Sequence, residues 1–358
     1  MSLVRRGSWL LCLVLSLGFA VSSQGGESTA EVNLLDEIWS FAGENFYPSA
    51  LRRRFDRASR AAVATDIAEG QTLNRALNRF LESLAVSHTR FYDRGDQGFY
   101  LLRSLFSSRN PDQPSLDVLG LQLTADGLVQ AVFEGFPADQ AGVRVSERIV
   151  AVNGRTFESV LDWQGNGPVT LVLEHGDRLR EVVLSPVHMG YHRALILATQ
   201  NSYRSIDCDD EQIGYLHLWS GTHDAFLTTL RDSVAESVQR SHAGFILDLR
   251  DGYGGAWWDY LDPFFPDRQT YFAATRLDGV SIERLLVEPA QNPDYYSGPL
   301  VVLINAGTRS GKESLAFQFA KTRRAKLIGT TTAGAFTAGM GVFSDRPQAD
   351  YLLYLSVA

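Results

Sequence analysis

Two short segments in the C-terminal half combine residue types that can break an acyl bond. Residues 244–255 are an apolar run followed by a turn that ends in two glycines, and residues 299–314 are an apolar run followed by a turn that contains Ser310. A hydroxyl can act as a nucleophile, and the backbone N–H groups of a glycine turn can bind the oxyanion that then forms. The two turns therefore offer a serine nucleophile at Ser310 and an oxyanion hole built from Gly254, Gly255 and Gly311. The alternative is that Ser310 is a turn or helix N-cap residue.

Each turn follows a segment with the pattern of a buried strand. The hydrophobic pattern predicts strands over 213–218, 244–249, 299–305 and 325–329, and helices over 225–240 and 311–322. This alternation is typical of an α/β fold with a mainly parallel sheet and crossover helices. Reacting groups in such sheets collect at the carboxyl ends of the strands, which is where both turns lie.

The rest of the chain divides into parts with different patterns. Residues 1–23 combine Arg5 and Arg6, an apolar run and small residues, which predicts a cleaved export signal, with an uncleaved anchor as the alternative. Residues 31–103 have helical spacing and form an N-terminal helical region. Residues 116–187 are strand-like, over 116–123, 129–133, 148–152, 169–173 and 181–184, and form a compact β-rich domain. The α/β domain is expected over 190–358.

Composition limits the partners. The chain of 358 residues has 33 Lys and Arg against 41 Asp and Glu, a formal net charge of −8, which argues against nucleic acid or an anionic membrane surface as partner. Cys12 lies in the export signal, so Cys208 is predicted to be a single buried thiol. His188 and His192 have the spacing of a ligand pair, but no acid or Cys completes a metal set nearby, and no cofactor is implied.

These segments resemble the tail-specific, or C-terminal-processing, serine protease family. Residues 244–255 are similar to its segment I-L-D-L-R-x-N-x-G-G, residues 299–314 to its nucleophile segment V-V-L-V-N-x-x-T-x-S-x-x-E, and residues 325–334 to A-x-L-V-G-x-x-T-x-G. Residues 116–187 look like the PDZ domain that these proteases insert. The resemblance covers about residues 31–358 and implies a crotonase-like protease sheet and a polypeptide substrate.

The resemblance also bears on the general base. Many members of the family place a Lys in the loop after T-x-G, where this chain has Ala335. The only lysines are Lys312, Lys321 and Lys326, and Lys312 stands two residues past Ser310 on the predicted helix, where side chains do not face each other. A Ser–Lys pair is therefore not expected.

A histidine is the expected base instead. The segment Ser87-His88-Thr89 looks like the S-H-T segment of the tricorn-like, lysine-free branch, which implies His88 as the base and Ser87 as the residue that orients it. The alternative is that His88 satisfies a local backbone group. The family places an orienting acid in an E-G-x-G-V-x-P-D segment downstream of the serine, and we expect that acid beyond Ala358. Glu313 matches the family's structural Glu.

The β-rich domain has its own predicted binding site. In Leu119-Gly120-Leu121 the glycine would leave backbone N–H groups to hold the C-terminal carboxylate of a peptide, whose tail would add as an extra strand. The alternative is a spacer without ligand. Aromatic residues over 257–265 are expected to be core, with a wall of the substrate site as the alternative.

Together these features predict an exported serine endopeptidase, periplasmic or extracellular, that engages polypeptides near their C-termini. One alternative is a catalytically inactive protein of the same fold that binds peptides or apolar ligands. Another is a hydrolase of other acyl bonds, such as esters.

Overall fold

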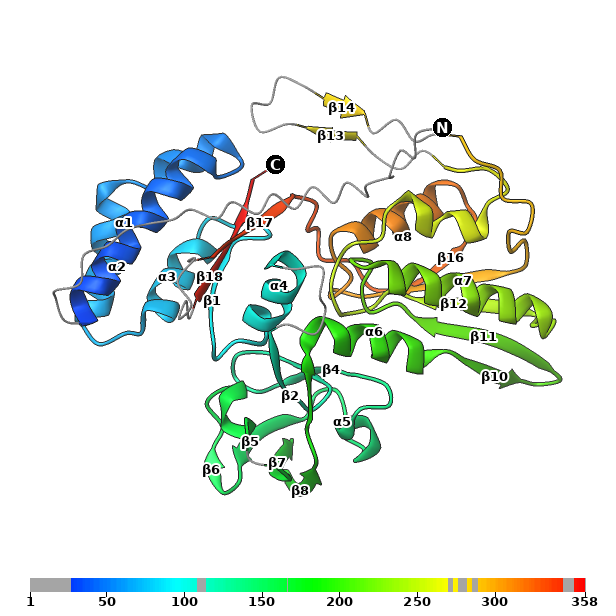
Figure 1. The fold of residues 1–358 in the computed structure, drawn as a ribbon, viewed down its shortest axis with the longest axis horizontal. Coiled ribbons are helices and arrows are strands. Elements are labelled where there is room, and N and C mark those ends of the chain that lie inside the picture. Colours follow the sequence, from blue (N-terminus) through cyan, green and yellow to red (C-terminus); the bar gives the residue numbers. More distant parts are fainter. Residues whose placement is uncertain are drawn as a thin grey trace, which may run out of the picture. The chain divides into compact units, whose positions relative to one another are not determined.

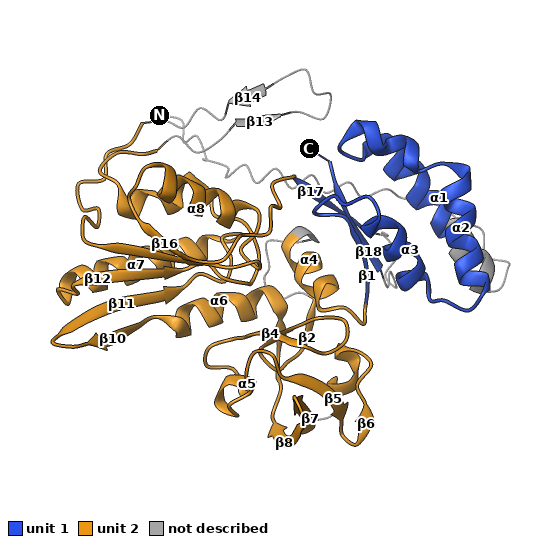
Figure 2. Cartoon of the chain, turned by 180° about the vertical axis from the view of Figure 1, so that it is seen from behind, with its two compact units in different colours: residues 1–93, 338–358 blue, residues 94–337 orange. Residues whose placement is uncertain are grey.

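The computed structural model describes residues 27–107, 114–165, 167–269, 273–275, 282–284, 289–343 and 351–357. The predicted export signal, residues 1–23, lies outside them. The chain divides into two compact units, which are described separately: residues 1–93 with 338–358, and residues 94–337 (Figure 2). Within the described ranges, no helix has both the length and the apolar character needed to cross a bilayer.

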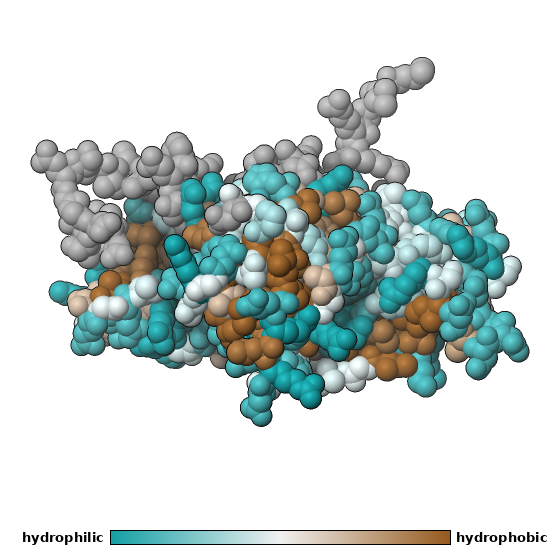
Figure 3. Space-filling view, turned by 90° about the horizontal axis from the view of Figure 1, so that it is seen from below, coloured by the Kyte–Doolittle hydropathy of each residue, from teal (hydrophilic) through white to brown (hydrophobic). Residues whose placement is uncertain are grey.

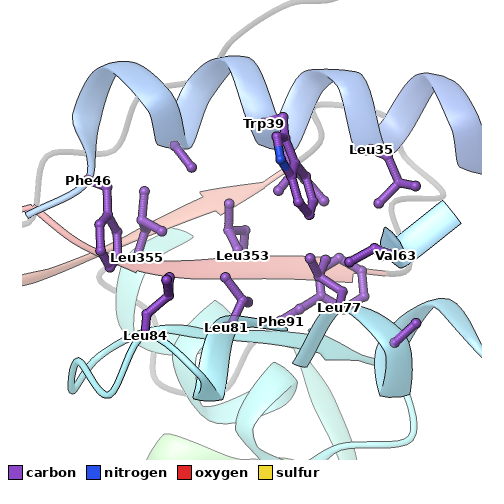
Figure 4. Packing of buried hydrophobic residues seen from close by; sticks show 13 residues of the cluster. Leu35, Trp39, Phe46, Val63, Leu77, Leu81, Leu84, Phe91, Leu353 and Leu355 are labelled. Carbon is purple, nitrogen blue, oxygen red and sulfur yellow. The ribbon is translucent and has the colours of Figure 1, made fainter. Parts of the chain in front are cut away.

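The first unit is a group of helices packed on a small sheet. The helices are α1 (Glu27–Asn45), η1 (Ser49–Arg54), α2 (Arg57–Ala68) and α3 (Leu73–Glu82), and the strands are β1 (Arg90–Asp93), β17 (Gly339–Phe343) and β18 (Tyr351–Ser356). β18 lies between the other two strands and is antiparallel to both. Figure 4 shows side chains of the helices meeting Leu353 and Leu355 of β18 in one buried cluster.

The second unit contains the predicted β-rich module as well as the main sheet (Figure 1). The module begins after α4 (Gln97–Ser107) and comprises β2 (Ser115–Val118), β3 (Leu121–Leu123), β4 (Val129–Val132), α5 (Pro137–Gln140), β5 (Arg148–Val152), β6 (Arg155–Thr156), η2 (Val160–Trp163), β7 (Val169–His175), β8 (Arg178–Leu184) and β9 (Val187–Gly190). Leu179 and Val183 of β8 are exposed. Figure 3 shows that the face seen from below carries hydrophobic areas among hydrophilic ones.

The main sheet has five strands in the order β10-β11-β12-β15-β16. They are β10 (Arg204–Cys208), β11 (Glu211–His217), β12 (Gly244–Asp248), β15 (Leu300–Ile304) and β16 (Lys326–Gly329), and only β10 is antiparallel to its neighbour. Helices α6 (Tyr191–Ser202) and α7 (Asp224–Gln239) pack on β11 and on each other, and α8 (Gly311–Lys321) packs on β16. The remaining elements are η3 (Trp258–Tyr260), η4 (Asp262–Phe264), β13 (Ala273–Thr275) and β14 (Ile282–Arg284).

This architecture confirms the predicted mixed α/β fold, with N-terminal helices, a β-rich insert and a mainly parallel sheet with crossover helices. Two expectations were wrong. The strand expected over 116–123 is broken at Leu119-Gly120, because Gly120 has φ +84°, and its two halves join different sheets. Cys208 is exposed rather than buried, since it ends the edge strand β10.

Candidate active site

The carboxyl ends of β11, β12, β15 and β16 lie at one edge of the main sheet. The four strands are parallel, so the segments that follow them, beginning at Leu218, Leu249, Asn305 and Thr330, leave the sheet on the same side. Ser310, Gly254, Gly255 and Gly311 all belong to these segments. The fold therefore brings these four predicted site residues together, as the sequence indicated.

Ser310 stands at a sharp turn between β15 and the first residue of α8. Its backbone has φ +55° and ψ −131°, a conformation that costs a non-glycine residue on the order of 1–3 kcal/mol. Strained strand-to-helix turns of this kind present a serine hydroxyl at the top of a sheet. The N–H of Ser310 donates to Oε2 of Glu313 at 3.0 Å, which fixes the turn.

The glycine pair lies directly against this turn. A β-carbon added at Gly254 would lie 2.6 Å from Cβ and 3.0 Å from Oγ of Ser310, and one added at Gly311 would lie 1.8 Å from the carbonyl oxygen of Gly255. Only glycine permits both approaches. Among the described residues, none accepts a hydrogen bond from the N–H groups of Gly254 or Gly255. These two groups can therefore act as oxyanion donors beside Ser310.

The loop that carries the glycine pair is held from several sides. Asp251 has φ +47° and its N–H donates to Oδ1 of Asn305 at 3.1 Å, while Nδ2 of Asn305 donates to Oδ1 of Asp251 at 3.0 Å. The N–H of Gly252 donates to Oε1 of Gln122 in β3 at 3.1 Å, so the β-rich module contacts this loop directly. The carbonyl of Gly254 accepts from the N–H of Gly221 at 2.9 Å.

Glu313 ties the nucleophile turn to the loop after β16. Its side chain is 2% exposed, and its Oε2 accepts from the N–H groups of Ser310 and Ala335, at 3.0 and 2.7 Å, while Oε1 accepts from Gly334 at 2.6 Å. A carboxylate that accepts three backbone N–H bonds is stably placed without a basic partner. The expectation that Glu313 is a structural residue fits this geometry.

Asp248, the last residue of β12, is a buried charged group. Asp248 pairs with Arg250, whose Nη2 lies 2.5 Å from Oδ2, and accepts from the hydroxyl of Tyr215 at 2.8 Å. Burial raises the pKa of Asp248, but His217, Arg250 and the hydrogen bonds outweigh burial and lower it to about 2. The carboxylate therefore stays ionised and holds the start of the glycine loop.

His217 joins this group to the β-rich module. Its Nδ1 lies 2.9 Å from Oε1 of Glu134, and its Nε2 donates to the carbonyl of Arg250 at 3.0 Å. Trp219 Nε1 donates to the other oxygen of Glu134 at 2.6 Å. Burial lowers the pKa of His217, yet the carboxylates of Asp248 and Glu134 outweigh burial and raise it above the ordinary value.

Lys312 contacts the segments that follow β11 and β12. It is fully buried, and its Nζ donates to four backbone carbonyls, those of Leu218, Trp219, Arg250 and Asp251. Burial lowers its pKa to about 7, while Asp248 and Asp251 favour the charged form. Within the described part of the chain it makes no hydrogen bond to Ser310.

The predicted base lies in the first unit, in the turn between α3 and β1. His88 has φ +57° and is 5% exposed. Its ring packs edge-on against the ring of Tyr354, with 5.4 Å between the ring centroids. Nδ1 of His88 lies 3.1 Å from Oγ of Ser87. In the tautomer in which Nδ1 carries the proton, Ser87 accepts it and Nε2 is the basic nitrogen. The local geometry of the pair therefore suits the roles expected for Ser87 and His88.

The predicted peptide site, Leu119-Gly120-Leu121, is closed in this structure. Nε2 of Gln97, in α4, donates to the carbonyl of Leu121, and Oε1 of the same residue accepts from the N–H of Leu123, both at 2.9 Å. The carbonyl of Leu121 also accepts from the hydroxyl of Tyr191 at 2.9 Å. The adjoining cavity, lined by Leu119, Leu121, Val160 and Trp163 among others, has a volume of about 10 Å³, which is too small for a side chain.

The remaining expectations concern histidines and aromatic residues. His188 lies in β9 and pairs with Asp117 at 2.8 Å, while His192 lies in α6 and contacts Thr222, so the two do not share a helix face. Within the described ranges, no three His, Cys, Asp or Glu side chains form a metal cluster. Tyr260, Phe264 and Phe265 are buried core residues, as expected, whereas Trp257 and Trp258 are only half-buried.

Sequence reasoning missed the roles of three residues of the site. Gln97, Glu134 and Lys312 are common residue types, and each acts on a partner at least 24 residues away. None of these long-range contacts has a local signal in the sequence.

Comparison with known proteins shows what this chain is similar to. Residues 212–346 match the model of peptidase family S41. The carboxy-terminal processing protease CtpA of Bacillus subtilis (strain 168) is 26% identical over 230 residues, which are 62% of this chain and 48% of the relative. The chloroplastic C-terminal processing peptidase of Tetradesmus obliquus is 26% identical over 301 residues, which are 72% of this chain and 58% of the relative. The chain thus spans about half the length of the curated relatives it matches.

A solved structure has a similar fold. The photosystem II D1 C-terminal processing protease matches with a TM-score of 0.54 and 20% identity, over 92% of this chain and 87% of that one. The family model covers the segments that carry Ser310, the glycine pair and the loop after β16. The part of the chain that carries the candidate site, residues 212–346, therefore matches peptidase family S41.

Proposed function

We propose that this protein is an exported serine endopeptidase that cleaves polypeptides near their C-termini. Ser310 is the nucleophile, and the N–H groups of Gly254, Gly255 and Gly311 bind the oxyanion. His88 is the base and Ser87 orients it. The observation that carries the proposal is the approach of Gly254 to the strained Ser310 turn, because it places backbone donors beside a hydroxyl at the carboxyl edge of the sheet.

The reaction follows from these roles. Oγ of Ser310 attacks the scissile carbonyl carbon while its proton passes to His88, and the carbonyl oxygen becomes the oxyanion. Collapse of this intermediate breaks the C–N bond, and the amine leaves with the proton from His88. Water then attacks the acyl-serine ester with His88 again as base, and the peptide acid and free Ser310 are restored. No cofactor takes part in the proposed sequence of steps.

Cleavage assays with the Ser310→Ala variant test this function. We expect the wild-type protein to hydrolyse a peptide substrate and the variant to lose at least about 10³-fold in kcat, since no other group replaces the nucleophile. Equal turnover by both proteins would overturn the assignment. If ester substrates alone are cleaved, the protein is a hydrolase of other acyl bonds, and if neither class is cleaved it is a binding protein of the same fold.

The polypeptide is proposed to engage the β-rich module through Leu119, Gly120 and Leu121. Support comes from the positive φ of Gly120, which turns the backbone between β2 and β3. The strand edge that a peptide tail would pair with is the one that Gln97 occupies, so binding requires Gln97 to leave. We therefore propose that the module binds peptide tails only after α4 has moved from this edge.

A further inference from the structure

Lys312 is a buried cation whose partners are carbonyl oxygens. Its Nζ lies 2.5 Å from the carbonyl oxygen of Asp251, 3.1 Å from that of Leu218, and 3.4 Å from those of Trp219 and Arg250. An ammonium has three N–H donors and no acceptor, so these oxygens satisfy it without a salt bridge. Moving an ammonium group from water into the protein interior costs several kcal/mol. The buried position of Lys312 beside the predicted nucleophile therefore calls for a structural explanation.

The four carbonyls come from the two chain segments that leave the sheet beside Ser310. Leu218 and Trp219 follow β11, and Arg250 and Asp251 follow β12. Lys312 itself is the second residue of α8, directly after the nucleophile turn. One side chain therefore joins the ends of β11 and β12 to the helix that carries Ser310.

The segment that Lys312 holds is strained. Asp251, whose carbonyl makes the shortest contact, has φ +47°, and Ala256 at the other end of the loop has φ +70°. Left-handed backbone at non-glycine residues persists only where the surroundings fix it. The carbonyl of Trp219 accepts from the N–H of Tyr253 at 2.8 Å as well as from Lys312, so the cation also fixes the acceptor that holds the middle of the loop.

We propose that Lys312 is a positioning residue of the oxyanion hole. By binding these carbonyls it holds the loop from Arg250 to Gly255 in the one conformation that directs the N–H groups of Gly254 and Gly255 to the side of Ser310. Lys312 does not touch the reacting atoms. The inference rests on the proposed function in its catalytic part, but the fixing of the loop is a physical property that can be measured without turnover.

Hydrogen exchange tests the fixing of the loop directly. Lys312→Met keeps the length and apolar stem of the side chain and removes its donors. Phe319→Leu is the matched control, because it weakens the buried side of the same helix without touching the four carbonyls. We expect exchange in residues 250–256 to become at least about tenfold faster in Lys312→Met than in Phe319→Leu, while residues 213–217 of β11 stay alike. Equal exchange in the two variants would overturn the proposal.

Kinetics then separate positioning from a general structural effect. An oxyanion donor acts in the transition state, so Lys312→Met is expected to lower kcat by about 10²-fold with KM within about twofold of wild type. Affinity for a peptide boronic acid, which mimics the tetrahedral intermediate, is expected to fall by a similar factor. A variant with fast loop exchange but unchanged kcat and boronate affinity would refute the catalytic part while leaving the peptidase assignment intact. An inactive wild-type protein would refute the peptidase assignment, and the exchange experiment would still decide whether Lys312 fixes the loop.

Discussion

Gly254 and Ser310 approach each other so closely that the smallest side chain does not fit between them. The β-carbon of an alanine at position 254 would lie 2.6 Å from Cβ of Ser310. The contact joins the segment after β12 to the turn before α8, and it explains why the two segments singled out in the sequence belong to one site.

Replacing Gly254 by alanine is expected to disable the site while leaving the fold in place. The added methyl group would displace the Ser310 turn or the loop from Arg250 to Gly255, and either movement separates the donors from the hydroxyl. We predict a loss of about 10²-fold or more in kcat, because one misplaced oxyanion donor costs that much. Gly43→Ala is the matched control: nothing lies within 4 Å of the added carbon and Gly43 is inside α1, so activity is unchanged and stability rises by about 0.5–1 kcal/mol. Full activity of Gly254→Ala would contradict the site.

Replacing Glu313 by glutamine is expected to destabilise the protein. The carboxylate accepts three backbone N–H groups, and an amide would turn its NH₂ group toward at least one of these donors. We predict a loss of about 1–3 kcal/mol in the free energy of unfolding, measured by urea denaturation. Glu236→Gln removes a charge of the same kind from an exposed i,i+4 pair on α7 and is expected to change stability by less than about 0.5 kcal/mol. Equal changes in the free energy of unfolding for the two substitutions would contradict a stabilising role for the buried hydrogen bonds of Glu313.

Removing Gln97 is expected to open the strand edge of β3. Its two hydrogen bonds to Leu121 and Leu123 must be broken before a peptide can pair there. A hexapeptide with an apolar last residue and a free carboxylate should therefore bind Gln97→Ala about 30-fold more tightly than wild type, as the two bonds together contribute about 2 kcal/mol. Calorimetry measures this, with the amidated peptide as the ligand control and Gln140→Ala, elsewhere in the same module, as the variant control. Unchanged affinity of Gln97→Ala for the peptide would contradict the proposal that Gln97 blocks this strand edge.

Low pH is expected to lower the free energy of unfolding by protonating Asp248. The pKa of this carboxyl is lowered from 3.8 to about 2 in the folded state. A depressed folded pKa contributes stability that is present above pH 3.8 and is lost as pH falls toward 2, since the unfolded chain takes up the proton first. The contribution is about 2 kcal/mol. In Asp248→Asn this part of the pH dependence should vanish, which urea denaturation between pH 2 and 5 would show. An identical pH dependence in the variant would contradict the assignment.

Export is expected to remove the first residues. The proposed signal ends near Ser22 or Ser23, so the N-terminus of protein recovered from outside the cytoplasm should begin close to those positions. N-terminal sequencing measures this. A recovered chain that still begins at Met1 would contradict cleavage and leave the anchor as the alternative.

The sequence predicted elements well where the signal is local. The strand over 148–152 has the bounds that were expected, and Asn153-Gly154, with φ +49° and +78°, makes the two-residue hairpin that this dipeptide favours. The turns at Ser310 and Gly254 were also visible, because small residues after apolar runs are a strong local pattern. What was not predictable depends on contacts between distant segments. Gln97 bonds to β3 and Lys312 to β11 and β12 only because the fold brings them there.

The breaks in prediction have physical causes. Gly120 ends β2 early because its left-handed backbone turns the chain, although the hydrophobic pattern continues through Leu123. Cys208 was assigned to the interior on the basis of its residue type, but β10 is an edge strand and the cysteine stands at its exposed end. Residue type and periodicity therefore located the segments of the candidate site, while the network of contacts around them required the structure.

The most direct test is to identify which serine reacts with a fluorophosphonate probe. Mass spectrometry of the labelled, purified protein should place the probe on Ser310, and labelling should be absent in Ser310→Ala and strongly slowed in His88→Ala, because the hydroxyl needs its base. A probe found on another serine, or a wild-type protein that remains unlabelled while folded, would contradict the proposal that Ser310 is the nucleophile of this chain.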